Sequence, residues 1–172
     1  MVPYSHMDLQ TGKAKFIQTW GQMGSSWGVT RTMGQIHALL LVSTDPLSAD
    51  DVMAELGISR GNVNTNMRML VDWGLAHKQN VPGERREFFV GEKDMSKVIK
   101  SVIVARKKRE LEPLIQLLEE IKRVEGPEEE TEEFRRVIGD LNLYSRKADA
   151  ALDALARADS HWLFSTFLNM IK

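Results

Sequence analysis

Residues 56–73 read LGISRGNVNTNMRMLVDW, and this stretch decides the fold. Gly57 is expected to end one helix, because glycine accepts the left-handed conformation that often closes a helix C-terminus. Ser59 is expected to begin the next, because its hydroxyl can accept a hydrogen bond from a free N–H group of the first turn. Two helices joined by about four residues must cross at a steep angle. The stretch therefore predicts a helix-turn-helix.

The second helix of this pair has one apolar side. Val63, Met67, Leu70 and Val71 recur at i, i+4, i+7 and i+8, which places them on a single face directed inward. The other face is polar and is expected to project outward as a recognition helix. Its candidate DNA contacts are Ser59, Arg60, Asn62, Asn64, Thr65 and Arg68.

The residue types on this outward face suit DNA. Arginine binds guanine edges or phosphates, asparagine can pair with adenine through two hydrogen bonds, and threonine offers a hydroxyl and a methyl group. No acidic residue lies between Arg60 and Met69. The alternative is that Asn62, Asn64 and Asn66 are surface filler. Three asparagines in five positions lower helix propensity, so we favour readout.

The flanking sequence completes a winged helix-turn-helix. Helical spacing predicts helices over 13–25 and 32–42, and a short helix that Ser48 caps and Gly57 ends. Strands are expected over 75–80 and 85–90, because the intervening Pro82-Gly83 pair suits a type II turn.

This predicted hairpin is the wing, and it carries three basic residues. Lys78, Arg85 and Arg86 are further candidate DNA contacts. An arginine near the tip can enter a minor groove or hold a phosphate, but the pattern does not choose between Arg85 and Arg86. An ordinary solvated hairpin is the alternative, since Glu84 and Glu87 lie beside them.

After Gly91 the chain is expected to be helical to its end. Apolar spacing predicts a helix over 95–121 that Pro113 kinks or splits, another over 129–156, and a last one from Asp159. A small winged domain does not need these helices to fold, so their apolar stripes predict a homodimer interface. Packing on their own winged domain is the alternative. The expected organisation is a flexible N-terminus over 1–12, a DNA-binding domain over 13–91 and a dimerisation region over 92–172.

Charge is distributed unevenly along the 172 residues. The net charge is -1, but residues 93–109 carry seven Lys or Arg against one Asp, whereas residues 110–133 carry ten Glu against two basic residues. This uneven distribution of charge fits a nucleic-acid-binding protein better than the net charge does. The acidic stretch also fits a solvated helix face.

The sequence resembles the GbsR-type regulators, a branch of the MarR-like winged-helix repressors. The matching segments are Trp27-Gly28, TRTMGQI at 30–36, ISRGNVNTNMR at 58–68, DWGL at 72–75 and PGERREFF at 82–89. The resemblance implies a homodimer in which terminal helices form the interface and two winged domains read half-sites of an operator. It also implies that Ser59 to Arg68 holds the recognition helix. Gln35 departs from the family, which has Arg at this position.

Other functional classes find little support in the sequence. There is no cysteine, the four histidines are scattered, and no nucleophile or phosphate-binding motif occurs, so we expect no enzyme, metal site or cofactor. No apolar run is long enough to span a bilayer and no signal peptide is evident, so we expect no membrane partner and a cytoplasmic location. A small-molecule effector remains open: relatives in the resembled family respond to choline-like cations, which aromatic faces can hold. The aromatic candidates are Trp20, Trp27, Tyr144 and Trp162.

Together these observations predict a mainly α protein with a small β-hairpin: a winged helix-turn-helix domain followed by long C-terminal dimerisation helices. The predicted function is that of a sequence-specific transcriptional regulator, expected to be a repressor, which binds double-stranded DNA at a pseudo-palindromic operator. One alternative is a winged-helix module that binds a protein without reading DNA. Another is a small-molecule-binding protein that has lost its DNA function.

Overall fold

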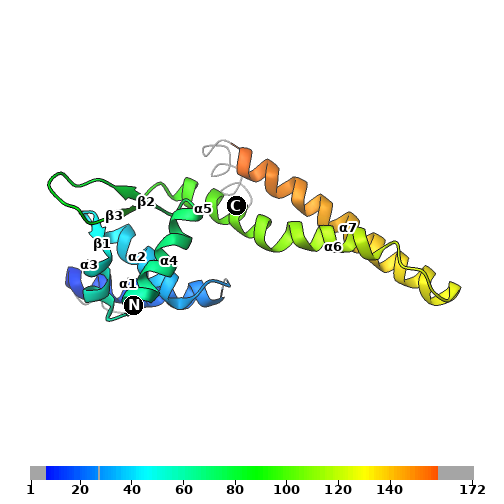
Figure 1. Cartoon of the computed structure of the whole chain (residues 1–172), viewed down its shortest axis with the longest axis horizontal. Helices are drawn as coiled ribbons and strands as arrows, with labels where there is room; N and C mark the ends of the chain where they lie inside the picture. The colour runs from blue at the N-terminus through cyan, green and yellow to red at the C-terminus, as the bar shows by residue number, and fades with distance from the viewer. Residues whose placement is uncertain (1–6, 27, 159–172) are drawn as a thin grey trace, which may run out of the picture. The chain divides into compact units, whose positions relative to one another are not determined.

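The computed structural model describes residues 7–26 and 28–158, and its contacts divide the chain into two units between Val98 and Ile99. Each unit is described by itself. The first contains four helices, three short strands and the start of a fifth helix (Figure 1). Its elements are α1 (Leu9–Ser26), α2 (Arg31–Val42), β1 (Leu47–Ser48), α3 (Ala49–Leu56), α4 (Arg60–Asp72), β2 (Ala76–Gln79), β3 (Phe88–Gly91) and the first turn of α5 (Met95–Arg106).

Helix α1 starts earlier than the sequence pattern predicts. It begins at Leu9, so it overlaps the stretch over 1–12 that was expected to be flexible. The Asp8 carboxylate explains the difference, because it accepts hydrogen bonds from the Thr11 backbone N–H (2.9 Å) and the Thr11 hydroxyl (2.6 Å). Asp8 thus acts as the N-terminal cap of α1.

Two glycines let α1 and α2 pack closely. A Cβ added at Gly34 would lie 2.9 Å from Gly21 Cα and 3.0 Å from the Trp20 carbonyl oxygen. The structure shows that Gly21 and Gly34 are needed at the helix contact, where no side chain fits.

The helix-turn-helix forms as predicted. Gly57 closes α3 in the left-handed conformation with φ 64°, and Ser59 caps α4 by accepting a hydrogen bond from Asn62 N. Ser48 and Asp51 cap α3 reciprocally, since each side chain accepts a hydrogen bond from the other residue's backbone N–H. These hydrogen bonds from Ser48 hold the pKa of Asp51 below its usual value.

Ser48→Ala is expected to lower the free energy of unfolding by about 1 kcal/mol, because it removes the cap of α3. The Ser48 side chain is buried, so water cannot replace the lost hydroxyl. Urea unfolding of the purified protein measures the change. Ser59→Ala is the matched control: its capping bond has nearly the same length (3.4 Å against 3.3 Å) but is exposed, so water can replace the hydroxyl and a smaller loss is expected. Equal losses would contradict this ranking.

The wing is a three-stranded antiparallel sheet rather than an isolated hairpin. Strand β3 lies in the centre, with β2 on one side and β1 on the other, so that Ser48 pairs with Phe88 and Lys78 pairs with Phe89. The expected type II turn is present: Gly83 has φ 84°, and the Glu84 N–H donates to the Val81 carbonyl over 3.1 Å. The two-residue strand β1 was missed, because it is too short to show an alternating pattern.

The second unit is a helical hairpin. After α5 come the π-helical segment η1 (Lys107–Leu111), α6 (Glu112–Ile121) and α7 (Glu128–Arg157), and α6 and α7 lie side by side (Figure 1). The predicted break at Pro113 is confirmed, because this residue lies in the first turn of α6, directly after η1. Proline has no N–H to donate, and it fits a first helical turn without losing a bond.

Ion pairs and hydrogen bonds connect the helices of this hairpin. Lys107 contacts Asp149 (3.1 Å) and Asp153 (2.9 Å), and these contacts raise the pKa of Lys107 above its usual value. Glu119 accepts hydrogen bonds from Asn142 and Arg146, which lower the pKa of Glu119 to about 2. Among the described residues, no helix is long and apolar enough to cross a membrane. The predicted last helix from Asp159 lies outside the described residues.

Candidate nucleic-acid interface

Helix α4 presents the polar face that its sequence predicts. Val63, Met67 and Leu70 are buried against the rest of the unit. The six candidate contacts on this helix and its cap, namely Ser59, Arg60, Asn62, Asn64, Thr65 and Arg68, are all exposed. One helix therefore supplies both a core face and a polar face with two arginines.

Asn66 does not belong to this exposed face. Its side chain is buried, and its Nδ2 group donates to the Asn62 carbonyl (2.9 Å) and to Asn62 Oδ1 (2.7 Å). The Thr30 hydroxyl donates to Asn66 Oδ1 over 2.8 Å. The interpretation of the three asparagines as one group is therefore corrected: Asn62 and Asn64 are exposed, whereas Asn66 connects α4 to the start of α2.

Arg60 has a carboxylate neighbour that the sequence of α4 does not reveal. Its guanidinium forms an ion pair with Asp50 in the first turn of α3. Both side chains are well exposed, and an exposed pair of this kind contributes about 0–1 kcal/mol. Arg60 can therefore exchange this partner for a phosphate at little cost.

The two arginines of the wing differ in their partners. The Arg86 guanidinium pairs with Glu84 (3.1 Å) and lies over the Phe88 ring, 5.4 Å from its centre. Lys78 pairs with Glu87. Arg85 is exposed, and no hydrogen bond or ion pair to it is found within residues 7–26 and 28–158. Arg85 also lies in the loop, because β3 begins only at Phe88.

A groove of about 470 Å³ runs between α4 and the wing. It carries both basic and acidic groups: Arg68 and Lys78 face it, as do Asp72 and Glu87. The other lining residues are Asn64, Met67, Val71 and Phe89. Arg68 of the recognition helix and Lys78 of the wing thus border the same groove. Its acidic residues are Asp72 at the end of α4 and Glu87 just before β3.

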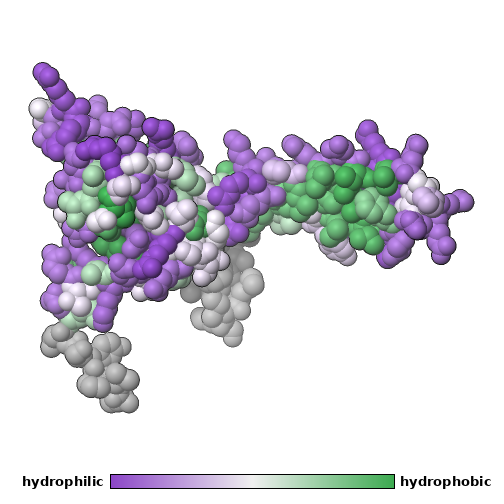
Figure 2. Space-filling view, turned by 60° about the horizontal axis from the view of Figure 1, so that its bottom comes forward, coloured by the Kyte–Doolittle hydropathy of each residue, from purple (hydrophilic) through white to green (hydrophobic). Residues whose placement is uncertain are grey.

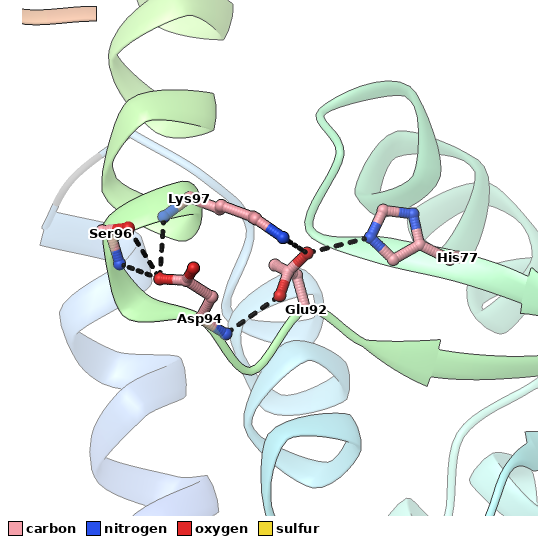
Figure 3. Close-up of polar contacts among 5 residues, drawn as sticks. All are labelled: His77, Glu92, Asp94, Ser96 and Lys97. Carbon is pink, nitrogen blue, oxygen red and sulfur yellow. Dashed lines mark hydrogen bonds and ion pairs between the residues drawn. The ribbon is translucent and has the colours of Figure 1, made fainter. Parts of the chain in front are cut away.

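Polar contacts tie the base of the wing to the first turn of α5 (Figure 3). Glu92 lies between His77 (3.4 Å) and Lys97 (3.9 Å), and its other oxygen accepts a hydrogen bond from the Asp94 N–H. That backbone bond is the main cause of the lowered pKa of Glu92. Asp94 in turn caps α5 through Ser96, which lowers the pKa of Asp94. These contacts join the base of the wing to the start of α5, so we interpret the cluster as structural.

The sequence pattern that defines the MarR family matches residues 27–87, from the start of α2 to the wing. Residues 27–87 are therefore similar to the MarR family. The resemblance seen in the sequence is thereby confirmed at the level of the family.

Two curated relatives match part of the chain. The chain is 34% identical to the HTH-type transcriptional regulator MmpR5 of Mycobacterium tuberculosis over 77 residues, which are 44% of this chain and 46% of the relative. It is 27% identical to the HTH-type transcriptional repressor GbsR of Bacillus subtilis over 94 residues, which are 55% of this chain and 52% of the relative. The chain thus spans about half the length of each curated relative.

A solved structure shares the fold over most of the chain. The crystal structure of a transcriptional regulator matches with a TM-score of 0.66 and 23% sequence identity, and the match covers 85% of this chain and 97% of that one. The predicted fold class, a mainly helical winged helix-turn-helix with long C-terminal helices, is confirmed.

The aromatic candidates for an effector site are only partly described. The Trp20 indole N–H donates to His37 Nδ1 over 3.3 Å, and this hydrogen bond connects α1 to α2. Tyr144 lies in the second unit, is well exposed, and has Lys147 Nζ 5.6 Å from its ring centre. Trp27 and Trp162 lie outside the described residues. An effector site made of these residues stays a prediction.

Gln35, the departure from the GbsR-type pattern, faces α1. Its side-chain amide donates to Gln18 Oε1 over 3.3 Å, and the same oxygen accepts a bond from Arg31 (2.7 Å). A Cβ added at Gly21 would lie 2.5 Å from Gln35 Cγ, so this side chain fills the space between the two helices. Its described contacts are structural.

Proposed function

We propose that this protein is a homodimeric transcriptional repressor that binds a pseudo-palindromic operator in double-stranded DNA. The observation that carries the proposal is the exposed face of α4, which has two arginines and no acid between Arg60 and Met69. The helix N-terminus adds the partial positive charge that attracts phosphate. The curated relatives, one a regulator and one a repressor by name, support the same function.

We assign roles according to exposure and partners. Arg68 and Asn64 read base edges, because both are exposed on α4 and line the groove toward the wing. Thr65 lies beside them on the exposed face. Arg60, Ser59 and Lys78 hold phosphates, which set the register of the helix in the major groove.

In the wing, Arg85 rather than Arg86 is proposed to contact DNA, because Arg86 would have to leave the Phe88 ring as well as the exposed carboxylate of Glu84. Arg85→Ala is expected to weaken operator binding by about tenfold and to reduce the slope of log affinity against log salt by about one. Arg86→Ala is the matched control and is expected to change the salt slope less. Fluorescence anisotropy across a salt series measures both. The reverse order would show that Arg86 leaves Glu84 on binding and is the DNA contact.

The dimer proposal depends on an apolar stripe along α7. Phe134, Val137, Leu141 and Tyr144 recur at i, i+3, i+7 and i+10, and all are exposed. The packed face of the helix, with Ile138 and Asn142, is a different one.

Leu114 and Leu117 add exposed apolar surface on α6, and Figure 2 shows this surface gathered on the helical hairpin. A continuous apolar patch of this kind marks an interface, and a second copy of the chain is the partner that symmetry favours.

The decisive experiment measures binding to labelled DNA from upstream of the protein's own gene, against a random fragment, at about 50 and 200 mM salt. We expect preference for the upstream fragment that persists at the higher salt. Equal, strongly salt-dependent binding to both fragments would establish that the protein has a DNA-binding surface but that the upstream fragment does not contain its operator. No binding at either salt would favour the second candidate, a winged-helix module that docks a protein on the apolar stripe of α6 and α7.

A further inference from the structure

A chain of partly buried hydrogen bonds connects the cap of α2 to the first turn of the recognition helix. Thr30 Oγ1 accepts a bond from Met33 N (3.0 Å) as the cap of α2 and donates to Asn66 Oδ1 (2.8 Å). Asn66 Nδ2 then donates to the Asn62 carbonyl (2.9 Å) and to Asn62 Oδ1 (2.7 Å). Asn66 is only 4% exposed, whereas Asn62 is exposed.

The donor and acceptor of each of these hydrogen bonds follow from the Asn62 carbonyl oxygen. The Asn62 carbonyl oxygen belongs to the backbone and can only accept, so the Asn66 atom beside it must be the amide nitrogen. The same nitrogen lies 2.7 Å from the Asn62 side-chain atom, which must be the oxygen, because two amide nitrogens at this distance would both be donors without an acceptor. Asn66 Oδ1 then accepts the single hydroxyl proton of Thr30, whose oxygen already accepts from Met33. The amide orientations of Asn66 and Asn62 are thus both determined.

This orientation limits what Asn62 can read. A bidentate contact with adenine requires the asparagine oxygen to accept from N6 while the nitrogen donates to N7. Asn62 Oδ1 is turned toward Asn66, which leaves only the Nδ2 group to face outward. No corresponding hydrogen bond is found for the Asn64 side chain within the described part of the chain, so both of its amide atoms are available.

We propose that Asn66 is a positioning residue for DNA recognition, which holds Asn62 as a donor-only contact and leaves Asn64 as the asparagine able to read adenine. Asn62 then binds an acceptor atom of the DNA, either a phosphate oxygen or a base atom such as guanine O6 or a purine N7. The assignment rests on the proposed function, because it gives Asn62 a role only when α4 lies on DNA. It also makes the register of the first turn depend on Thr30, a residue outside the helix-turn-helix.

The first test uses the free protein and needs no DNA. Proton exchange of the side-chain amides is measured by NMR on the isotope-labelled chain. Both Asn66 Nδ2 protons are expected to exchange at least about tenfold more slowly than those of Asn62, because they are buried and bonded whereas the Asn62 protons face solvent. Thr30→Ser, which keeps the hydroxyl, should preserve this difference, and Thr30→Val should reduce it. Protected Asn62 protons, or Asn66 protons exchanging as fast as those of Asn62, would overturn the orientation.

The second test uses a duplex selected by the wild-type protein from a randomised library. Each adenine of the selected site is replaced in turn by purine, which keeps N7 and lacks the N6 amino group. Where Asn64 reads an adenine, the replacement should cost the wild-type protein about tenfold in affinity and Asn64→Ala nearly nothing further. For Asn62→Ala the cost should equal the wild-type cost within twofold at every adenine. An adenine whose replacement cost disappears in Asn62→Ala would overturn the proposal.

Asn66→Ala completes the test, because it removes the group that holds Asn62. It is expected to reduce the preference for the selected duplex over random duplex by about tenfold while leaving affinity for random duplex within twofold. Equal losses on both duplexes would indicate a purely structural role and overturn the positioning assignment. If the wild-type protein selects no sequence, the proposed function fails, and the exchange rates of the free protein still decide the orientation of Asn62.

Discussion

Leu141→Glu is expected to convert the dimer into monomers and to weaken operator binding by about a hundredfold or more. Leu141 is 51% exposed in the single chain and lies in the middle of the apolar stripe on α7. A carboxylate at this position would be buried without a partner in the dimer, which is strongly unfavourable. Loss of the dimer then removes the gain from binding two linked half-sites, which is about a hundredfold to ten-thousandfold.

Gly139→Glu is the matched control for this change. It adds the same side chain to the same helix, and a Cβ at Gly139 meets nothing within 4 Å. At about 100° per residue, position 139 points away from position 141, so the control leaves the stripe intact. Sedimentation equilibrium measures the molar mass of each variant, and anisotropy measures its DNA affinity. A Leu141→Glu protein that remains dimeric would contradict the proposed interface.

Acidification is expected to destabilise the first unit through His37. Burial lowers the pKa of His37 from 6.5 to about 4. A base whose pKa is lower in the folded state binds its proton more readily when unfolded, so stability falls as the pH drops below 6.5 and continues to fall until about pH 4. The difference between the two pKa values corresponds to a loss of roughly 3 kcal/mol over this range.

The contacts of His37 support the cause assigned to this loss. Its Nδ1 atom accepts a bond from Trp20, and no acceptor for its buried Nε2 group is found among the described residues. Urea unfolding at pH 7 and at intervals down to pH 4 measures the free energy of unfolding. His37→Gln places a polar amide that does not titrate near Trp20, so the stability of this variant should depend less on pH over this range. Trp20→Phe removes the indole N–H together with part of the ring but leaves the titrating His37 in place, so it should keep the wild-type dependence. A His37→Gln protein with an unchanged pH profile would contradict burial of the imidazole as the cause.

The helix-turn-helix was predictable because local signals specify it. Ser48, Gly57 and Ser59 act within a few residues of their own positions, as caps and as a left-handed C-terminus, and the structure places each in its predicted role. The inward face of α4 followed from helical spacing alone. The type II turn of the wing followed from Pro82-Gly83, since these residues restrict or permit φ by their own covalent structure.

Features that depend on distant parts of the chain were missed. Strand β1 has two residues and exists only because β3, some forty residues later, offers it a partner. The π-helical segment η1 was expected only as a kink at Pro113. The close contact of Gly21 with Gly34 depends on how α1 and α2 meet, which the spacing of glycines along one helix does not show.

The sequence by itself determined the helix-turn-helix with the caps of α3 and α4, the turn of the wing and the polar face of the recognition helix, because each depends on neighbours within about one helical turn. The tertiary structure decided which polar residues on those elements have partners. Asn66 looks equivalent to Asn62 and Asn64 in the sequence, but its side chain is buried and accepts a hydrogen bond from Thr30, which lies 36 residues away. Arg85 and Arg86 are adjacent in the chain, but only Arg86 pairs with Glu84 and stacks on Phe88. Such partners are set by the packing of separate elements in space, and no local pattern specifies them.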